Sequence, residues 1–220
     1  KGVMLSHKNI VSNVIDCEKR VPFRKGQSKA LSFLPVCHVF ERMILYLYQY
    51  CGVEIYFAES IEKMGDNLKE VKPMVMTAVP RLYEKVYDKI IAKGLGGNLE
   101  LMVSGSAALQ VRLTRVFAAA GLPIMEGYGL TETSPVISVN DMRNGGFKIG
   151  TVGKIIDNVD IKIAEDGEIL CKGPNVMMGY YKDTGKTAEV MTDGYFHTGD
   201  IGEIDADGFL KITDRKKEMF

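Results

Sequence analysis

The sequence predicts an α/β fold of layered, mostly parallel sheets with helices on both faces, followed by a small β-rich subdomain shaped as a distorted barrel. Three observations support this prediction. Short apolar runs alternate with helical patterns up to about residue 150, Asp-Gly turns join alternating runs after it, and the composition is that of a globular protein. Hydrophobic residues make up 46% of the 220 residues and charged residues 25%, which are ordinary values for a folded domain.

The alternation runs through the first two thirds of the chain. Ser6 is a favourable N-cap for a first helix, because its hydroxyl can accept a free backbone N–H. Helical patterns cover 7–20, 40–52, 60–73, 80–94 and 108–121. Strand-like apolar runs cover 30–36, 53–58, 74–79, 99–105 and 123–129. Strands that alternate with helices form parallel sheets, and ligands bind at the carboxyl ends of such strands.

After about Gly150 the pattern changes to hairpins. Polar and apolar residues alternate on both sides of Asp166-Gly167, and the same arrangement recurs around Asp207-Gly208. An Asp-Gly pair between two such runs is a strong hairpin signal, because both residues tolerate the positive φ angles of a tight turn. We therefore expect a β-rich subdomain in this part of the chain.

Charge and cysteine content narrow the class of protein. Lys plus Arg and Asp plus Glu each total 28, so the formal net charge is zero, which argues against a general nucleic-acid binder. The four cysteines form no CxxC motif, which favours free thiols in a reducing compartment. No apolar run is long and uninterrupted enough to cross a bilayer.

Two strand ends carry candidate ligand-binding groups. In VSGSAAL (103–109), small residues follow a strand, so the backbone can approach a flat ligand closely; a tight packing turn is the alternative. In GYGLTETSP (127–135), Tyr128 offers a planar ring, Thr131 a hydroxyl for a phosphate, and Glu132 a carboxylate for Mg²⁺. A solvated loop with a helix cap is the alternative for this second segment.

Two later segments add polar groups. In DGYFHTGDIG (193–202), Asp200 can accept both hydroxyls of a ribose, as acidic residues do in other nucleotide-binding folds. His197 is a candidate base, although a single His near a turn is more often structural. In DRKKEMF (214–220), Arg215 can pair with ribose or phosphate, and a solvated basic stretch is the alternative.

Other kinds of site have weaker support. VSGSAAL lacks the G-x-S-x-G spacing of a hydrolase nucleophile. His38 and Glu41 are spaced as two metal ligands on a helix, but no second cluster completes a site. DADG (205–208) is similar to the start of a calcium loop and lacks the later ligands, so a hairpin turn explains it.

Seven motifs together resemble the adenylate-forming, or AMP-binding, superfamily in their order and mostly in their spacing. They are KGVMLSH, LSFLPVCHVFERM, VSGSAAL, EGYGLTETSP, GEILCKGPNVMMGYY, DGYFHTGDIGEID and ITDRKKEMF. The second motif is most similar to the stretch around the gating His of long-chain fatty-acid–CoA ligases. Single motifs of this kind are weak, whereas seven in register along the whole chain are specific.

The resemblance implies that a fatty acid is activated with ATP and Mg²⁺ to an acyl adenylate, and that the acyl group is then passed to coenzyme A. A carboxylate is a poor acyl donor because its leaving group would be oxide. Attached AMP supplies a stabilised leaving group, and Mg²⁺ and cationic groups neutralise the charge that develops on the phosphates.

The resemblance also implies a role for residues at matching positions. The two walls of the adenine slot would be Gly105, Ser106 and Ala107 on one side and Glu126, Gly127 and Tyr128 on the other. The reacting and sugar groups would be held by Thr131 at the α-phosphate, Glu132 at Mg²⁺, and Asp200 with Arg215 at the ribose. The remaining assignments are Lys1 at the end of the phosphate loop, His38 beside the acyl and CoA channel, and Lys217 at the hinge.

These assignments divide the chain into four parts. We expect an α/β subdomain with the acyl and CoA channel over 1–94, a second with the adenine and Mg²⁺ loops over 95–150, a β-rich subdomain over 151–213, and the start of a hinge over 214–220. Both ends break within motifs, so we expect a fragment of a larger N-terminal domain. Long-chain ligases usually carry a further helical stretch between the positions of Gly94 and Leu95. Either the protein is shortened there or residues are missing from this sequence, and we expect the second.

Two other functions stay open at this point. One is a nucleotide-binding fragment without turnover, and the other is activation of a different carboxylate, such as an aryl acid. We expect a cytoplasmic location, with peripheral membrane contact left open because the substrate is an acyl chain. The expected partners are small molecules, namely fatty acid, ATP and CoA, and no nucleic acid.

Overall fold

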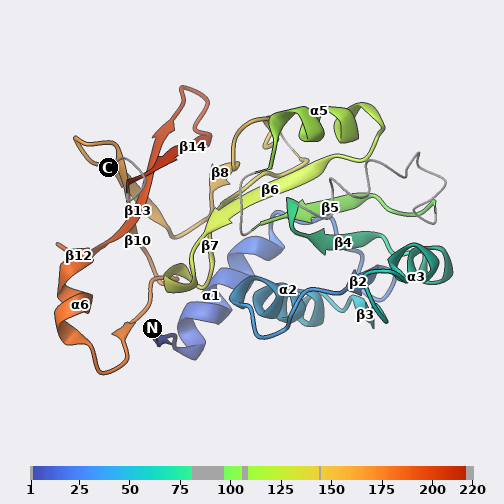
Figure 1. The fold of residues 1–220 in the computed structure, drawn as a ribbon, viewed down its shortest axis with the longest axis horizontal. Coiled ribbons are helices and arrows are strands. Elements are labelled where there is room, and N and C mark those ends of the chain that lie inside the picture. The colour runs from blue at the N-terminus through green and yellow to red at the C-terminus, as the bar shows by residue number, and fades with distance from the viewer. Residues whose placement is uncertain (1, 81–96, 106–108, 144, 217–220) are drawn as a thin grey trace. The chain divides into compact units, whose positions relative to one another are not determined.

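The computed structural model describes residues 2–80, 97–105, 109–143 and 145–216 (Figure 1). Two compact units emerge. The central unit is Val21–Glu126, and the two-segment unit combines Lys1–Arg20 with Gly127–Phe220. The boundary between the two units falls between Glu126 and Gly127, within strand β6 (Ile124–Gly129). The helix expected over 80–94 lies almost entirely outside the described residues.

The central unit is built on parallel strands in the order β3-β2-β4-β5-β6. Their bounds are β2 Lys29–Ser32, β3 Glu54–Phe57, β4 Val75–Ala78, β5 Leu101–Ser104 and β6 Ile124–Gly129. The helices are α2 Val39–Tyr50, α3 Met64–Val71 and α5 Val111–Ala119. All four residues of β4 and of β5 are buried, as expected of inner strands that are covered on both faces.

Helices cover both faces of this sheet. Leu68 of α3 and Phe117 of α5 join one hydrophobic cluster with Leu31 and Met102 from the strands. Helix α2 lies on the other face, where its Glu41 bonds side chains of β2 and β4. Figure 1 shows α2 and α5 on opposite sides of the strands. This arrangement confirms the predicted α/β class.

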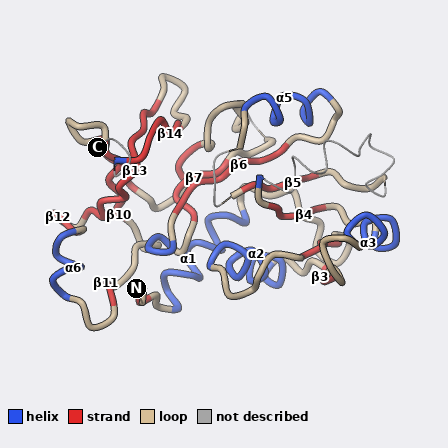
Figure 2. Tube along the Cα trace, in the orientation of Figure 1, coloured by secondary structure: helices blue, strands red, loops and turns tan. Residues whose placement is uncertain are grey.

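The two-segment unit is mostly antiparallel and curled (Figure 2). Its main sheet has the order β12-β13-β10-β9, with β14 paired to β13. The strands are β9 Asp160–Ile163, β10 Glu168–Lys172, β12 Met191–Thr192, β13 Tyr195–Ile204 and β14 Leu210–Arg215. Gly167 and Gly208 have φ angles of 82° and 83°, as the predicted Asp-Gly turns require.

Shorter elements complete this unit. They are β1 Val3–Met4, α1 His7–Glu18, η2 Thr131–Thr133, β7 Val136–Val139, β8 Lys154–Ile155, β11 Gly179–Tyr180 and α6 Thr184–Glu189. Strand β7 pairs antiparallel with the end of β6 and was not predicted. Its four residues, three of them apolar, are too few to separate strand from loop by pattern. Within the described residues, no helix has both the length and the apolar character to span a membrane.

Two asparagines attach the first helix to residues far along the chain. Asn13 is fully buried, its Nδ2 donates to the backbone oxygen of Val136 at 2.8 Å, and its Oδ1 accepts from the Val136 N–H at 3.1 Å. Asn9 donates to the backbone oxygens of Pro174 and Val176 at 2.7 and 2.9 Å. Since buried backbone groups need partners, these side chains replace a strand neighbour.

Replacing Asn13 with alanine is therefore expected to lower the free energy of unfolding by about 2 kcal/mol, because the Val136 N–H loses its buried side-chain acceptor, while the Val136 oxygen loses Asn13 and keeps the bond from Asn175 Nδ2 at 3.2 Å. Denaturant unfolding followed by circular dichroism measures the change. Glu18→Ala, an exposed position on the same helix, is the control and is expected to change stability by less than about 0.5 kcal/mol. Equal stability of the two variants would contradict the anchoring role.

Candidate functional site

The turn after β6 is rigidly held. Thr133 is fully buried, and its hydroxyl accepts from the Leu130 N–H at 2.9 Å. The backbone oxygen of Glu132 accepts from the Met177 N–H at 2.7 Å. Thr131, by contrast, is exposed. The backbone of η2 is thus fixed from inside, while the Thr131 hydroxyl is accessible to a ligand.

Glu132 is oriented by a tyrosine that the sequence did not single out. The Tyr180 hydroxyl donates to Glu132 Oε1 at 2.9 Å. Burial and the neighbouring Glu132 carboxylate raise the pKa of Tyr180 to about 12, so the hydroxyl keeps its proton and remains a donor at neutral pH. Tyr180 lies within the GPNVMMGYY segment, which resembled a family motif but contained no obvious chemical group beyond its two tyrosines.

The start of the described chain also lies near the turn at η2. Val3 of β1 pairs with Tyr180 of β11, and Met4 pairs with Gly179. Strand β1 also contacts η2. Residues just after the expected phosphate loop therefore lie beside Glu132, as a nucleotide site would need. Lys1 itself lies outside the described residues.

The donor set around Glu132 fits Mg²⁺ brought in with phosphates. Glu132 is half-buried and has one carboxylate oxygen engaged by Tyr180. Nowhere in the described ranges do three or more His, Cys, Asp or Glu side chains gather as a metal cluster. Mg²⁺ is commonly held by one or two carboxylates together with substrate phosphates and water. A single oriented carboxylate beside β1, which follows the expected end of a phosphate loop, is compatible with that pattern.

Three of the predicted nucleotide-site residues meet in the two-segment unit. The Tyr128 hydroxyl donates to Asp200 Oδ2 at 2.7 Å, and Arg215 Nε donates to Asp200 Oδ1 at 3.0 Å. Asp200 on β13 faces Arg215 on β14 in register. Asp200 is buried, whereas the Arg215 side chain is 62% exposed. Burial and the Asp200 carboxylate both raise the pKa of Tyr128, which keeps its hydroxyl protonated.

The other adenine-wall candidates are divided between the units. Gly105 is buried directly after β5, whereas Gly127 lies on the part of β6 that belongs to the two-segment unit. Glu126 accepts from the Thr114 hydroxyl of α5 at 3.0 Å, and burial raises its pKa. Its carboxylate is thus engaged by the helix α5. Ser106 and Ala107 lie outside the described residues.

The two histidine candidates have different environments. His38 is exposed and caps α2, with Nδ1 accepting from the Phe40 N–H at 3.2 Å. His197 lies 3.0 Å from Glu168 through Nδ1 and 3.1 Å from the Thr192 hydroxyl through Nε2. With both ring nitrogens engaged, His197 fits the structural alternative. Lys217, the expected hinge residue, lies outside the described residues.

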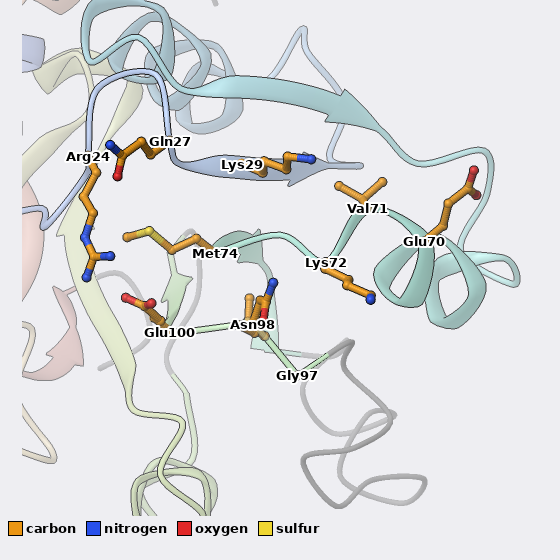
Figure 3. A pocket seen from close by; sticks show the side chains of 11 residues that line it. Arg24, Gln27, Lys29, Glu70, Val71, Lys72, Met74, Gly97, Asn98 and Glu100 are labelled. Atoms are coloured by element: carbon orange, nitrogen blue, oxygen red, sulfur yellow. The ribbon is translucent and has the colours of Figure 1, made fainter.

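The described part of the central unit has a hollow elsewhere. It has a volume of about 590 Å³ and is lined by charged and polar groups together with Val71, Met74 and Leu99 (Figure 3). Lys29 begins β2, Met74 precedes β4 and Glu100 precedes β5, so this hollow lies at the amino ends of the strands. Ligands of parallel sheets bind at the carboxyl ends, where Gly105 lies. We therefore do not assign the nucleotide to this hollow.

Comparison with known proteins identifies the class. A model of the AMP-binding enzyme family matches residues 1–181. Because the match covers most of the chain, the chain belongs to this family. This finding confirms the resemblance to adenylate-forming enzymes that the seven motifs indicated.

Among individual relatives, the long-chain-fatty-acid–CoA ligase FadD15 of Mycobacterium bovis is 34% identical over 271 aligned residues, covering all of this chain and 45% of that ligase. Long-chain-fatty-acid–CoA ligase 5 of Rattus norvegicus is also 34% identical, with 41% of its length covered. The chain therefore spans less than half the length of these relatives.

Solved structures show the same fold. The N-terminal domain of FACL13 from Mycobacterium tuberculosis superposes with a TM-score of 0.86 at 24% identity, covering 98% of this chain and 57% of that one. The o-succinylbenzoate CoA synthetase of Bacillus subtilis, solved with ATP and a magnesium ion, gives a TM-score of 0.87 at 22% identity, covering 99% of this chain and 48% of that one.

Proposed function

We propose that the natural protein carrying this chain is a long-chain fatty-acid–CoA ligase that forms an acyl adenylate. The observation that carries the nucleotide half of this proposal is the meeting of Tyr128, Asp200 and Arg215, which are far apart in sequence and joined by hydrogen bonds of 2.7 and 3.0 Å. The acyl half is supported by relatives that are named as long-chain-fatty-acid–CoA ligases.

The proposed reaction has two displacements. A fatty-acid carboxylate oxygen attacks the α-phosphorus of ATP, and the bond to the bridging oxygen breaks so that pyrophosphate leaves. The thiol sulfur of CoA then attacks the acyl carbon, loses its proton, and expels AMP. In the first step Thr131 donates to an α-phosphate oxygen and Glu132 holds Mg²⁺, which supplies positive charge to the phosphates when bound.

The remaining residues bind and orient the substrates. The Tyr128 ring stacks on adenine, and Asp200 accepts the ribose hydroxyls while Arg215 lies beside the sugar. Backbone atoms of Gly105, Ser106, Ala107, Glu126 and Gly127 form the walls of the adenine slot. Lys1 ends the phosphate loop, His38 borders the acyl and CoA channel, and Lys217 is the hinge. The four parts expected from the sequence, and the gap between Gly94 and Leu95, remain predictions within this proposal.

The cellular setting follows from the same proposal. The four cysteines, Cys17, Cys37, Cys51 and Cys171, are all free thiols, which supports the cytoplasm. Contact with a membrane surface would give access to acyl substrates. We propose a cytoplasmic enzyme that meets membranes peripherally.

Fatty-acid-dependent exchange between ATP and labelled pyrophosphate tests the proposed function. In the natural chain that carries this sequence, we expect exchange with long-chain fatty acids to exceed exchange with medium-chain acids and with o-succinylbenzoate. An aryl-acid ligase would show the reverse order. We expect the 220 residues alone to bind ATP without exchange; exchange by the 220 residues would contradict that expectation.

A further inference from the structure

A buried acidic group lies at the carboxyl ends of the central strands. Glu41, in the first turn of α2, is fully buried. Its Oε1 accepts a short hydrogen bond from the Ser32 hydroxyl, and its Oε2 accepts from the Thr77 hydroxyl at 3.0 Å. Both hydroxyl residues are themselves fully buried. Ser32 ends β2 and Thr77 is the third residue of β4, so one side chain ties the helix to two strands.

This arrangement is costly for stability alone. No lysine or arginine in the described ranges forms an ion pair with Glu41, and its burial raises its pKa, although the two hydroxyl bonds oppose that rise. Burying a carboxyl group without a cation is unfavourable, and an apolar side chain of similar size packs as well or better. The presence of Glu41 therefore indicates that its hydrogen bonds to Ser32 and Thr77 fix the position of α2, which an apolar side chain at this position could not do.

The residue before Glu41, Phe40, shows what the position of α2 determines. Phe40 is 8% exposed, and its ring lies against Gly105. A Cβ atom added at Gly105 would lie 2.8 Å from Phe40 Cε2 and 2.9 Å from Cζ. Real Cβ atoms essentially never lie so close to another atom, so a side chain at Gly105 would require the Phe40 ring to shift. The first turn of α2 thus sets the position of the backbone just after β5.

We propose that Glu41 is a positioning residue for the nucleotide. Held between Ser32 and Thr77, its carboxyl group fixes the first turn of α2, so that Phe40 supports Gly105 at the edge of the adenine slot. The inference rests on the proposed function, because Gly105 belongs to that slot only if the chain binds ATP. Its test therefore measures nucleotide binding without turnover as well as catalysis.

The experiment compares three variants of the natural chain that carries this sequence. Glu41→Ala removes the acceptor of both hydroxyls, Glu41→Gln keeps the shape and one carbonyl oxygen, and Leu47→Ala is a matched control on α2. Leu47 is 2% exposed, so its truncation also destabilises the fold. The measurements are the Kd of a non-hydrolysable ATP analogue by calorimetry, the KM and kcat of pyrophosphate exchange per active site, and Tm.

We expect Glu41→Ala to raise the Kd of the ATP analogue and the KM for ATP about tenfold, which corresponds to a loss of about 1.4 kcal/mol of binding free energy, with kcat per active site changed less than about threefold. Glu41→Gln should recover most of the affinity. Leu47→Ala should lower Tm while leaving Kd and KM unchanged. A purely structural role for Glu41 predicts instead that both alanine variants lower Tm and neither changes Kd.

Each outcome decides between the hypotheses. Wild-type affinity in a folded Glu41→Ala variant overturns the positioning role, as does an equal loss of affinity in Leu47→Ala. If Glu41→Ala does not fold, Phe40→Leu replaces it, with the same tenfold weakening expected and unchanged affinity overturning the proposal. If the wild-type protein binds no ATP analogue at all, the proposed function fails first, and that result is distinct from a failure at Glu41.

Discussion

Replacing Glu132 with alanine in the natural chain is expected to lower the rate of ATP–pyrophosphate exchange by about a hundredfold or more, the scale on which loss of one charge-stabilising group acts. The carboxylate is half-buried and already oriented by Tyr180 at 2.9 Å, so it can engage Mg²⁺ without reorganisation. The fold should persist, because the turn is held by the Thr133 side chain and the backbone bond from Met177. Exchange measured across a range of Mg²⁺ concentrations gives the effect.

Two controls separate metal binding from a general loss of charge. Tyr180→Phe keeps the Glu132 carboxylate and removes only the group that orients it. It should raise the Mg²⁺ concentration for half-maximal exchange about tenfold, as loss of a ligand's hydrogen-bond partner does, with the maximal rate retained. Glu165→Ala removes an exposed carboxylate of the same unit and should change nothing. Near-normal exchange in Glu132→Ala would remove Glu132 from the metal site.

The strands of the central unit were predictable because their pattern is local. The runs over 74–79 and 99–105 are apolar and bounded by Pro or Gly, and the structure places β4 and β5 within them. A fully buried parallel strand needs only such a run between helical patterns. The Asp-Gly hairpins were predictable for the same reason, since the turn itself requires those residues.

The contacts of the candidate site were not predictable in this way. Tyr180 reaches Glu132 because β1 pairs with β11, and Asn13 replaces a strand neighbour of Val136. Both depend on long-range pairings whose registers no local pattern encodes. Glu132 and Asp200 were predicted as site residues from their chemistry at strand and turn positions and from motif resemblance, whereas their hydrogen-bond partners are known only from the fold.

The environment of Glu41 could not be predicted from its spacing to His38. His38 and Glu41 are three residues apart, as two metal ligands on a helix would be. The structure turns them to different surroundings, because His38 is exposed at the N-cap while Glu41 is fully buried against Ser32 and Thr77. Spacing predicts that two residues lie close together on one helix, whereas packing against the sheet determines which of them is exposed to solvent.

Asp200→Asn is expected to raise the KM for ATP about tenfold or more, because hydrogen bonds to a charged acceptor are worth more than those to a neutral amide. Both carboxylate oxygens are engaged, one by Tyr128 and the other by Arg215. Each oxygen has a second lone pair that a ribose hydroxyl can use. The measurement compares ATP with 2′-deoxy-ATP and 3′-deoxy-ATP in the exchange reaction.

The sugar analogues identify the bond that is lost. The wild-type enzyme should prefer ATP over either deoxy analogue, and Asp200→Asn should reduce that preference while binding the analogues nearly as well as the wild type does. Asp207→Asn is the matched control, since this aspartate is 69% exposed and pairs with Lys148 at the surface; it should keep both the KM and the preference. A rise in KM that is equal for ATP and both deoxy analogues would assign Asp200 to holding Tyr128 and Arg215 in place, and would leave the ribose to another residue.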